Sequence, residues 1–167
     1  GRRHVRRRNP RNAGGDRPCG SASEGDRQSR PTDGLRLERS EAKELATLGV
    51  RITNAVNEQL TFRHPTQSDW RHHSFCLFAG KLEKDDKGLR AKSVVSIQPG
   101  KLDRSPTGTA VSARMALLHA QGKMAVGDRF TGVSIIDSEF HGEILGTTRL
   151  GDVPAIRPSI SGRAWVT

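Results

Sequence analysis

Residues 110–121 hold eight apolar side chains in twelve positions, so a helix over this segment is apolar on nearly all of its sides. A helix of this kind is expected to be buried, because a surface helix carries polar residues along one face. Gly122 is placed to end it. A polar loop at residues 101–109 leads directly into the helix. The rest of the chain must therefore provide elements that wrap around this segment.

A second helix is predicted over residues 40–60, with Ser40 as its N-cap. Its apolar residues fall at steps of three and four and form one stripe: Leu45, Leu48, Ile52, Val56 and Leu60. Apolar runs bounded by turn residues predict strands at 75–78, 93–98, 129–136, 139–145, 153–156 and 164–167, with a hairpin tip at 85–88. One central helix among several short strands indicates an α+β fold.

The first 34 residues differ from the rest of the chain. They carry nine arginines and four acidic residues, and contain no Leu, Ile, Met, Phe or Trp. Such a segment cannot bury enough apolar surface to offset the entropy lost on ordering, so we expect disorder there. We therefore divide the chain into a basic segment, 1–34, and a globular domain, 35–167.

Composition excludes several classes of protein. The chain has 167 residues, enough for one ordinary domain. No apolar run approaches the roughly 18 residues of a membrane span, so we expect no membrane partner. Two cysteines exclude a disulfide scaffold and indicate a reducing compartment, which we take to be the cytoplasm.

The loop before the apolar helix is a candidate anion site. The first N–H groups of a helix have no partner within the helix, and Gly108 allows a ligand to approach the backbone closely. Asp103 could accept a hydrogen bond from an ammonium or imino nitrogen, so the loop suits an amino or imino acid. The alternative is purely structural: Thr109 caps the helix and Asp103 forms a turn.

Residues 94–109 read Val-Val-Ser-Ile-Gln-Pro-Gly-Lys-Leu-Asp-Arg-Ser-Pro-Thr-Gly-Thr, followed by Ser-Ala-Arg at 112–114. This run closely resembles the proline racemase family, which includes 4-hydroxyproline epimerases and trans-3-hydroxy-L-proline dehydratases. Similar stretches occur at 45–60, 70–78, 127–136, 138–141 and 158–165. The resemblance extends over about residues 34–167.

The resemblance implies one lobe of the diaminopimelate epimerase-like, two-lobed fold, with the substrate between the lobes. It also implies a cofactor-independent enzyme, no metal, an imino acid such as hydroxyproline or proline as substrate, and a full-length protein that could form a homodimer. Carried over by motif, Asp103, Gly108, Thr109 and His72 would bind substrate, with His73 as the alternative to His72. The catalytic cysteine of the first lobe, in a Pro-Cys-Gly-His motif, has no counterpart here, so we expect the chain to be a second-half fragment that is inactive alone.

Thr107 decides which reaction the resemblance implies. Racemases and epimerases of the family have a cysteine at this position, because inverting a carbon requires an acid/base group on each face. A thiol can be tuned to ionise near neutral pH, whereas a threonine hydroxyl cannot. Elimination needs only one base, so Thr107 favours a trans-3-hydroxy-L-proline dehydratase that yields Δ1-pyrroline-2-carboxylate. Epimerase or racemase activity is the alternative.

Two features depart from the family pattern. Ala110 stands where the family usually has glycine, and its methyl group could crowd a ligand or favour the helix. Pro18-Cys19-Gly20 superficially resembles the first catalytic motif, but Ser21 follows in place of histidine and the spacing to Asp103 is too short. We interpret residues 1–33 instead as a segment translated out of frame.

Parts of the sequence suggest two other functions. The arginine-rich segment could bind nucleic acid through phosphate contacts, but no recognition motif accompanies it, so we expect no specific nucleic-acid partner. His72, His73 and Cys76 could bind zinc, but adjacent histidines converge poorly on one ion and a fourth ligand is not evident. We interpret Cys76, His119 and His141 as structural residues.

Overall fold

Strand β3 (Gly88–Ile97) runs through the middle of the molecule and joins two parts of one mixed sheet. The computed structural model describes residues 34–164. The strands follow the order β1-β3-β5-β6-β7, and the short strands β2 and β4 also pair with β3. Strands β3 and β5 are parallel, and the other neighbours are antiparallel. The remaining strands are β1 (Phe75–Ala79), β2 (Glu83–Asp85), β4 (Lys101–Leu102), β5 (Arg129–Val133), β6 (Glu139–Leu150) and β7 (Val153–Gly162).

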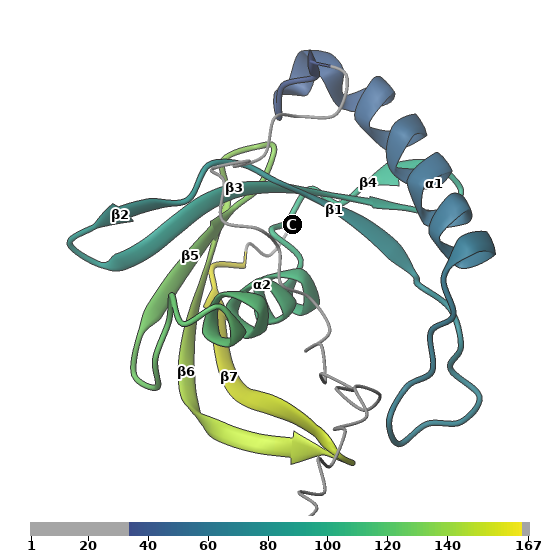
Figure 1. Ribbon diagram of the computed structural model, residues 1–167. Coiled ribbons are helices and arrows are strands. Elements are labelled where there is room, and N and C mark those ends of the chain that lie inside the picture. Colours follow the sequence, from purple (N-terminus) through teal and green to yellow (C-terminus); the bar gives the residue numbers. More distant parts are fainter. Residues whose placement is uncertain (1–33, 165–167) are drawn as a thin grey trace, which may run out of the picture.

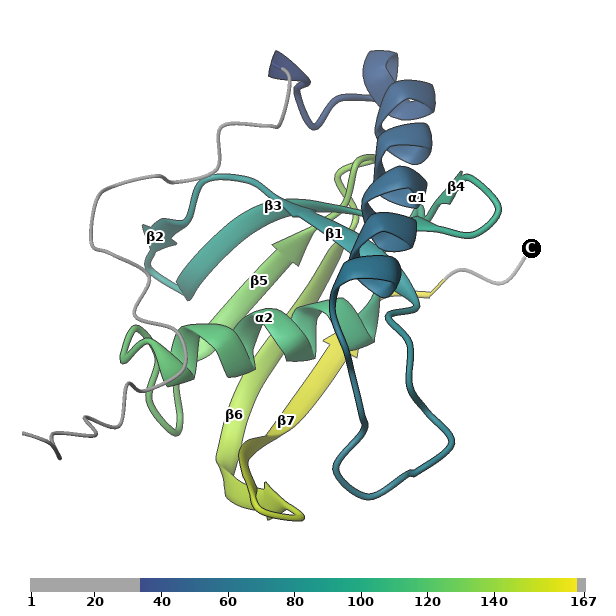
Figure 2. The same cartoon turned by 45° about the vertical axis from the view of Figure 1, so that its right-hand side comes forward.

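Each helix covers a different part of this sheet. Helix α1 (Ala42–Gln59) packs on β1, β3 and β4, whereas α2 (Gly108–Ala120) packs on β5, β6 and β7. Figures 1 and 2 show α2 lying across the curved strands β5–β7 and α1 standing beside β1 and β4. The core has two corresponding clusters. Leu45, Val94 and Ile135 form one, and Ala91, Val111, Met115, Leu118, Met124, Phe130 and Ile144 form the other.

Helix α1 begins differently from the prediction. A short 3₁₀ helix, η2 (Arg39–Glu41), precedes it, so Glu41 rather than Ser40 occupies the N-cap position, without a side-chain cap hydrogen bond. Gly49 lies at the closest approach to the sheet: a Cβ there would be 2.3 Å from Cβ of Ser96. Leu60 ends the predicted apolar stripe, but it lies outside the helix and is 61% exposed.

Helix α2 is buried on one side only, and the prediction of burial on nearly all sides was wrong for the described part of the chain. Val111, Met115 and Leu118 face the sheet, where glycines make room for them. A Cβ on Gly142 would lie 2.6 Å from Sδ of Met115. On the opposite side of the helix, no residue within 34–164 covers Ala113, Leu117 and Ala120, which are exposed. Gly122, at a φ of +70°, follows the helix end as predicted.

The α+β fold and most predicted strands are confirmed, with longer boundaries. Strand β3 begins five residues before the predicted 93–98, and β6 and β7 extend beyond 145 and 156 because they form one long twisted hairpin with a bulge between Ile144 and Gly146. The strand predicted at 164–167 lies outside the described residues apart from Ala164, which is not in a strand. Residues 1–33, including Cys19, also lie outside them. Within residues 34–164 no helix has the length and apolarity needed to cross a membrane.

Candidate active site at the start of helix α2

The loop from Asp103 to Thr107 is fixed to strands β3 and β5 and to the turn between β5 and β6. The Asp103 N–H donates to the carbonyl of Val95 in β3 at 3.0 Å. Pro106 is fully buried and lies beside Gly132 of β5, where a Cβ would be 3.5 Å from that of Pro106. The Ser138 hydroxyl, just before β6, donates to the carbonyl of Arg104 at 3.2 Å. The loop is therefore held in one place relative to the sheet.

The carboxylate of Asp103 organises the inside of this loop. Its Oδ1 accepts from the N–H of Ser105 at 2.9 Å and from the Ser105 hydroxyl at 3.0 Å. Its Oδ2 accepts from the Thr107 hydroxyl at 2.6 Å. A carboxylate offers about four acceptor positions, so one remains for a further donor. Asp103 thus forms the turn that a purely structural role predicts. Its carboxylate nevertheless has one acceptor position left for a ligand.

These hydrogen bonds also set the charge of Asp103. Burial raises the pKa of the carboxyl, but the hydrogen bonds from Thr107 and Ser105 outweigh it and leave the pKa below its ordinary value. The group is therefore ionised at neutral pH. It can accept hydrogen bonds from a ligand's ammonium or imino group, and it cannot serve as a proton donor there.

Thr107 turns the chain into the helix in an unusual conformation. Its φ is +60° and its ψ 107°, which is rare for a β-branched residue. Such strain collects at functional sites because the surrounding structure must enforce it. The Thr107 hydroxyl gives its hydrogen to Asp103, so it presents only lone pairs to any other group.

The first backbone N–H groups of α2 have no hydrogen-bond partner in the described part of the chain. No described residue accepts a hydrogen bond from the N–H groups of Gly108, Thr109 or Ala110, whereas the N–H of Val111 reaches the carbonyl of Thr107 at 3.0 Å. Three donors at the positive end of a thirteen-residue helix attract an anion. Thr109 does not cap the helix, because it lies inside it; Thr107 occupies the N-cap position, without a side-chain cap hydrogen bond. Ala110 is a buried residue, so its methyl group packs against protein atoms.

His72 is not brought to this loop. It precedes β1, which pairs with one edge of β3, whereas the loop follows β4 on the other edge. The His72 side chain is exposed, and its carbonyl accepts from Nε1 of Trp70 at 2.9 Å. His73 bonds instead to Asn57 of α1, its N–H donating to Oδ1 at 2.7 Å. The structure thus unites Asp103, Thr107, Gly108 and Thr109 but leaves the histidines apart.

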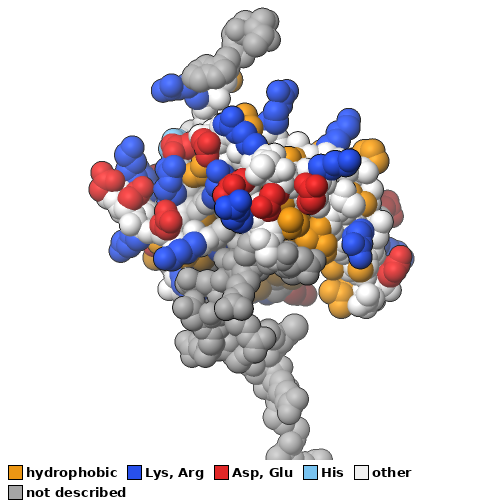
Figure 3. Space-filling model, turned by 90° about the horizontal axis from the view of Figure 1, so that it is seen from above, with side chains coloured by type: hydrophobic (Ala, Val, Ile, Leu, Met, Phe, Trp, Pro, Cys, Tyr) orange, Lys and Arg blue, Asp and Glu red, His pale blue; other side chains and the backbone are white. Residues whose placement is uncertain are grey.

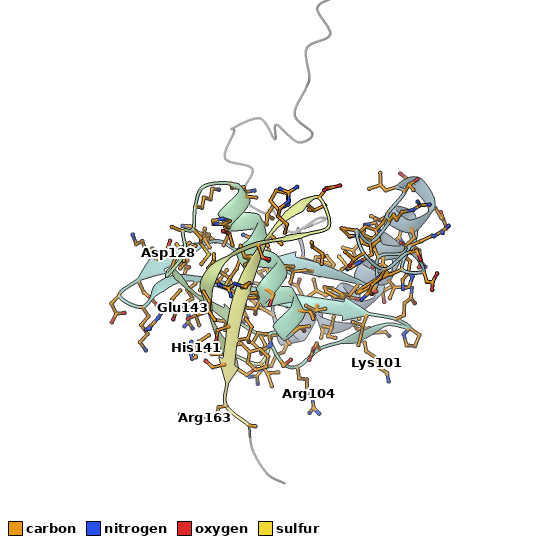
Figure 4. The ribbon with its side chains drawn as sticks, turned by 90° about the horizontal axis from the view of Figure 1, so that it is seen from below. Lys101, Arg104, Asp128, His141, Glu143 and Arg163 are labelled. Carbon is orange, nitrogen blue, oxygen red and sulfur yellow. The ribbon has the colours of Figure 1, made fainter. Side chains whose placement is uncertain are left out.

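A cavity lies elsewhere on the sheet. It has a volume of about 430 Å³ and is lined largely by paired residues on one face of β5–β7, such as Thr131, His141 and Ser161. The side chains of Phe130 and Ile160 pack with the core cluster that contains Met115 of α2, and a Cβ on Gly142 would meet Met115. Thr131, His141 and Ser161 alternate with these positions along the strands, so they lie on the opposite face of the sheet, although Phe130 and Gly142 also border the cavity. Figure 4 shows His141 and Glu143 of β6 away from Arg104 of the loop.

Cys76, His119 and His141 have structural surroundings. Burial raises the pKa of the Cys76 thiol, which keeps it protonated at neutral pH. Nδ1 of His119 contacts the carbonyl of Met124 at 2.8 Å, and Nδ1 of His141 contacts the Thr131 hydroxyl at 3.2 Å. Among residues 34–164 no group of three or more His, Cys, Asp or Glu side chains is placed to hold a metal ion. In Figure 3 acidic and basic side chains are mixed over the visible face, without a continuous basic stripe.

Sequence reasoning missed Ser105 and Ser138. Ser105 bridges Asp103 and Thr107, because its hydroxyl donates to the first and accepts from the N–H of the second at 3.2 Å. The Asp-x-Ser spacing is a local signal for such a side-chain turn. Ser138 is 34 residues away from Arg104, and no local pattern predicts that contact.

Comparison with known proteins gives one consistent match. The family model described as "Proline racemase" matches residues 29–167. A probable proline racemase from Agrobacterium radiobacter K84, solved with bound carbonate, is 34% identical with a TM-score of 0.69, over 78% of this chain and 37% of that chain. A hydroxyproline epimerase from Agrobacterium vitis, solved with bound trans-4-hydroxy-L-proline, is 32% identical with a TM-score of 0.70, over 78% of this chain and 36% of that one. The chain thus spans just over a third of the length of these structures.

Proposed function

The chain belongs to the proline racemase family, and from that premise we propose that it forms the part of a cofactor-independent enzyme that binds an imino acid at the start of α2. The unpartnered N–H groups of Gly108 and Thr109 carry the proposal, because they offer a carboxylate donors at the positive end of a helix. The N–H of Ala110 also has no partner among the described residues, but it belongs to a buried residue. At its remaining acceptor position, the carboxylate of Asp103 accepts a hydrogen bond from the ring N–H of the same ligand. One loop thus recognises both charges of a zwitterion.

The proposed reaction is dehydration of trans-3-hydroxy-L-proline. A base removes the proton at Cα, and its conjugate acid returns that proton to the C3 hydroxyl, which leaves as water. The resulting enamine tautomerises to Δ1-pyrroline-2-carboxylate. Thr107 supports elimination over inversion, since its hydroxyl donates to Asp103 and has no acidity near neutral pH. It can orient the substrate by accepting a hydrogen bond from it, but it cannot deliver a proton to the second face of Cα.

The base itself is not in this loop. Asp103 is held by three hydrogen bonds within the loop, and Cys76 lies on β1 with a raised pKa. The resemblance to the family assigns the base to a cysteine of the first lobe. We therefore propose that the chain does not turn over substrate by itself.

Epimerisation of hydroxyproline is the second candidate. It is favoured by the similarity to the Agrobacterium vitis hydroxyproline epimerase. The two reactions differ in what they require at position 107, because only epimerisation needs a second group that ionises.

A chimera tests the choice between them. Residues 35–167 of this chain replace the matching part of the Agrobacterium vitis epimerase, which supplies the rest of the enzyme. We expect the chimera to form the imine from trans-3-hydroxy-L-proline and to leave trans-4-hydroxy-L-proline unchanged. Thr107→Cys should restore epimerisation, because a thiol again stands on the second face.

Two controls accompany the chimera. Thr107→Val, which has the same shape but no hydroxyl, should weaken the dehydratase without creating an epimerase. The original chain, assayed alone, should form no imine. Epimerisation by the unmodified chimera would contradict the dehydratase assignment, and imine formation by the chain alone would contradict the need for a second lobe.

A further inference from the structure

We propose that Ser138, with Ser134 behind it, is a positioning residue that sets the geometry of the substrate loop through the backbone of Arg104. The proposal rests on the proposed function, since it concerns the same loop. Ser138 and Ser134 belong to the turn between β5 and β6, about 30 residues along the chain from the loop. Neither side chain reaches the ligand-binding groups directly.

The direction of the hydroxyl hydrogens follows from the donors around Ser134. This side chain is fully buried, and its Oγ accepts from the N–H groups of Ile136 and Ser138, both at 3.2 Å. Its own hydrogen is therefore directed to Oγ of Ser138, 2.8 Å away. The Ser138 hydroxyl accepts that hydrogen and directs its own to the carbonyl of Arg104 at 3.2 Å. Two consecutive hydrogen bonds, both donated in the direction of the loop, thus connect Ser134 through Ser138 to the carbonyl of Arg104.

The bond to Arg104 controls the peptide plane that carries the Asp103 network. The carbonyl of Arg104 and the N–H of Ser105 belong to the same planar peptide unit. Ser138 holds one end of that unit, and Oδ1 of Asp103 accepts from the other end at 2.9 Å. Rotation of the plane would break the contact that keeps Asp103 turned toward Thr107. The Arg104 side chain points out from the molecule (Figure 4), so its backbone makes this contribution.

The turn is itself anchored on its outer side. Asp137 has a φ of +65° and pairs with Nζ of Lys92 at 2.9 Å. Arg39, next to α1, donates to the carbonyl of Ile136 at 3.2 Å. The turn is therefore fixed to β3 and to the segment before α1. These contacts hold Ser138 in a constant position relative to the loop.

The test compares Ser138→Ala with Ser138→Thr in the ¹⁵N-labelled chain. Ser161→Ala is the matched control, because it also removes a serine hydroxyl that donates to a carbonyl, that of His141 at 3.3 Å. Two quantities are measured: amide hydrogen exchange at Ser105 and Thr107, and the dissociation constant for trans-3-hydroxy-L-proline from the shifts of the Gly108–Ala110 amides. Exchange at Ile144, whose N–H donates to Asp128, reports on the fold as a whole.

We expect Ser138→Ala to raise exchange at Ser105 and Thr107 and to weaken binding, each roughly three- to tenfold, the value of one hydrogen bond. Ser138→Thr should restore both quantities, and Ser161→Ala should change neither. Unchanged exchange in Ser138→Ala, an equal rise at Ile144, or failure of Ser138→Thr to rescue would overturn the positioning role. If no form of the chain binds the ligand while exchange responds as expected, the proposed function fails and the positioning role stands.

Discussion

At the scale of single residues, the conformation of the loop depends on the charge of Asp103. One carboxylate joins the Ser105 backbone, the Ser105 hydroxyl and the Thr107 hydroxyl, so it fixes the conformation of the loop. The sequence predicted that Asp103, Gly108 and Thr109 lie together because they are close along the chain. It could not predict the partner of Ser138, because that contact depends on how β5 and β6 pack beside the loop.

Loss of charge at Asp103 should loosen the loop in a pH-dependent way. The pKa is lower in the folded protein than the usual value near 3.9, so the carboxylate stabilises the fold above about pH 4 and loses this effect as pH falls through the folded pKa. We expect Asp103→Asn to reduce the free energy of unfolding by about 1 kcal/mol at pH 7, the net value of a hydrogen bond to a partly exposed group.

Urea unfolding at pH 7 and at about pH 3 measures this effect. The difference between the wild type and Asp103→Asn should shrink at the lower pH, where the wild-type carboxyl is increasingly protonated. Asp69→Asn, in an exposed loop, is the control and should have little effect at either pH. A destabilisation by Asp103→Asn that is equal at the two pH values would show that the charge is not the stabilising feature.

At the scale of elements, periodicity identified both helices and most strands, but it did not identify what covers α2. The segment 110–121 is apolar on nearly all sides, which indicated complete burial. In the described part of the chain the sheet β5–β7 covers one side, and the other carries exposed Ala113, Leu117 and Ala120. An apolar sequence indicates that a helix can be buried. It does not indicate which neighbouring elements cover each side of the helix.

Leu117 and Leu118 lie on opposite sides of this helix and allow the two sides to be compared. Leu118 is 1% exposed and Leu117 is 47% exposed. We expect Leu118→Ala to lower the free energy of unfolding by about 2–5 kcal/mol, because it leaves a cavity in the core. Leu117→Ala should change it by less than about 1 kcal/mol, and thermal or urea unfolding measures both. Equal costs would mean that the outer side of α2 is packed as tightly as the inner side.

At the scale of the whole molecule, the proposed function makes the described residues one half of a binding site. They provide anion donors at the start of α2 and an acceptor at Asp103, but no group in the loop that could remove a proton from carbon. The two solved relatives are each more than twice as long as this chain. We expect the remaining parts of such an enzyme to supply the base, so binding and turnover are separate properties that can be tested apart.

Binding at the start of α2 is the central claim, and amide chemical shifts of the ¹⁵N-labelled chain test it most directly. One titration uses trans-3-hydroxy-L-proline, and the other uses pyrrolidin-3-ol, which has the same ring and hydroxyl but no carboxylate. We predict saturable shifts at Gly108, Thr109 and Ala110 with the imino acid and none with the amino alcohol. The claim is contradicted if these three amides stay in place with both compounds, or if they respond equally to both.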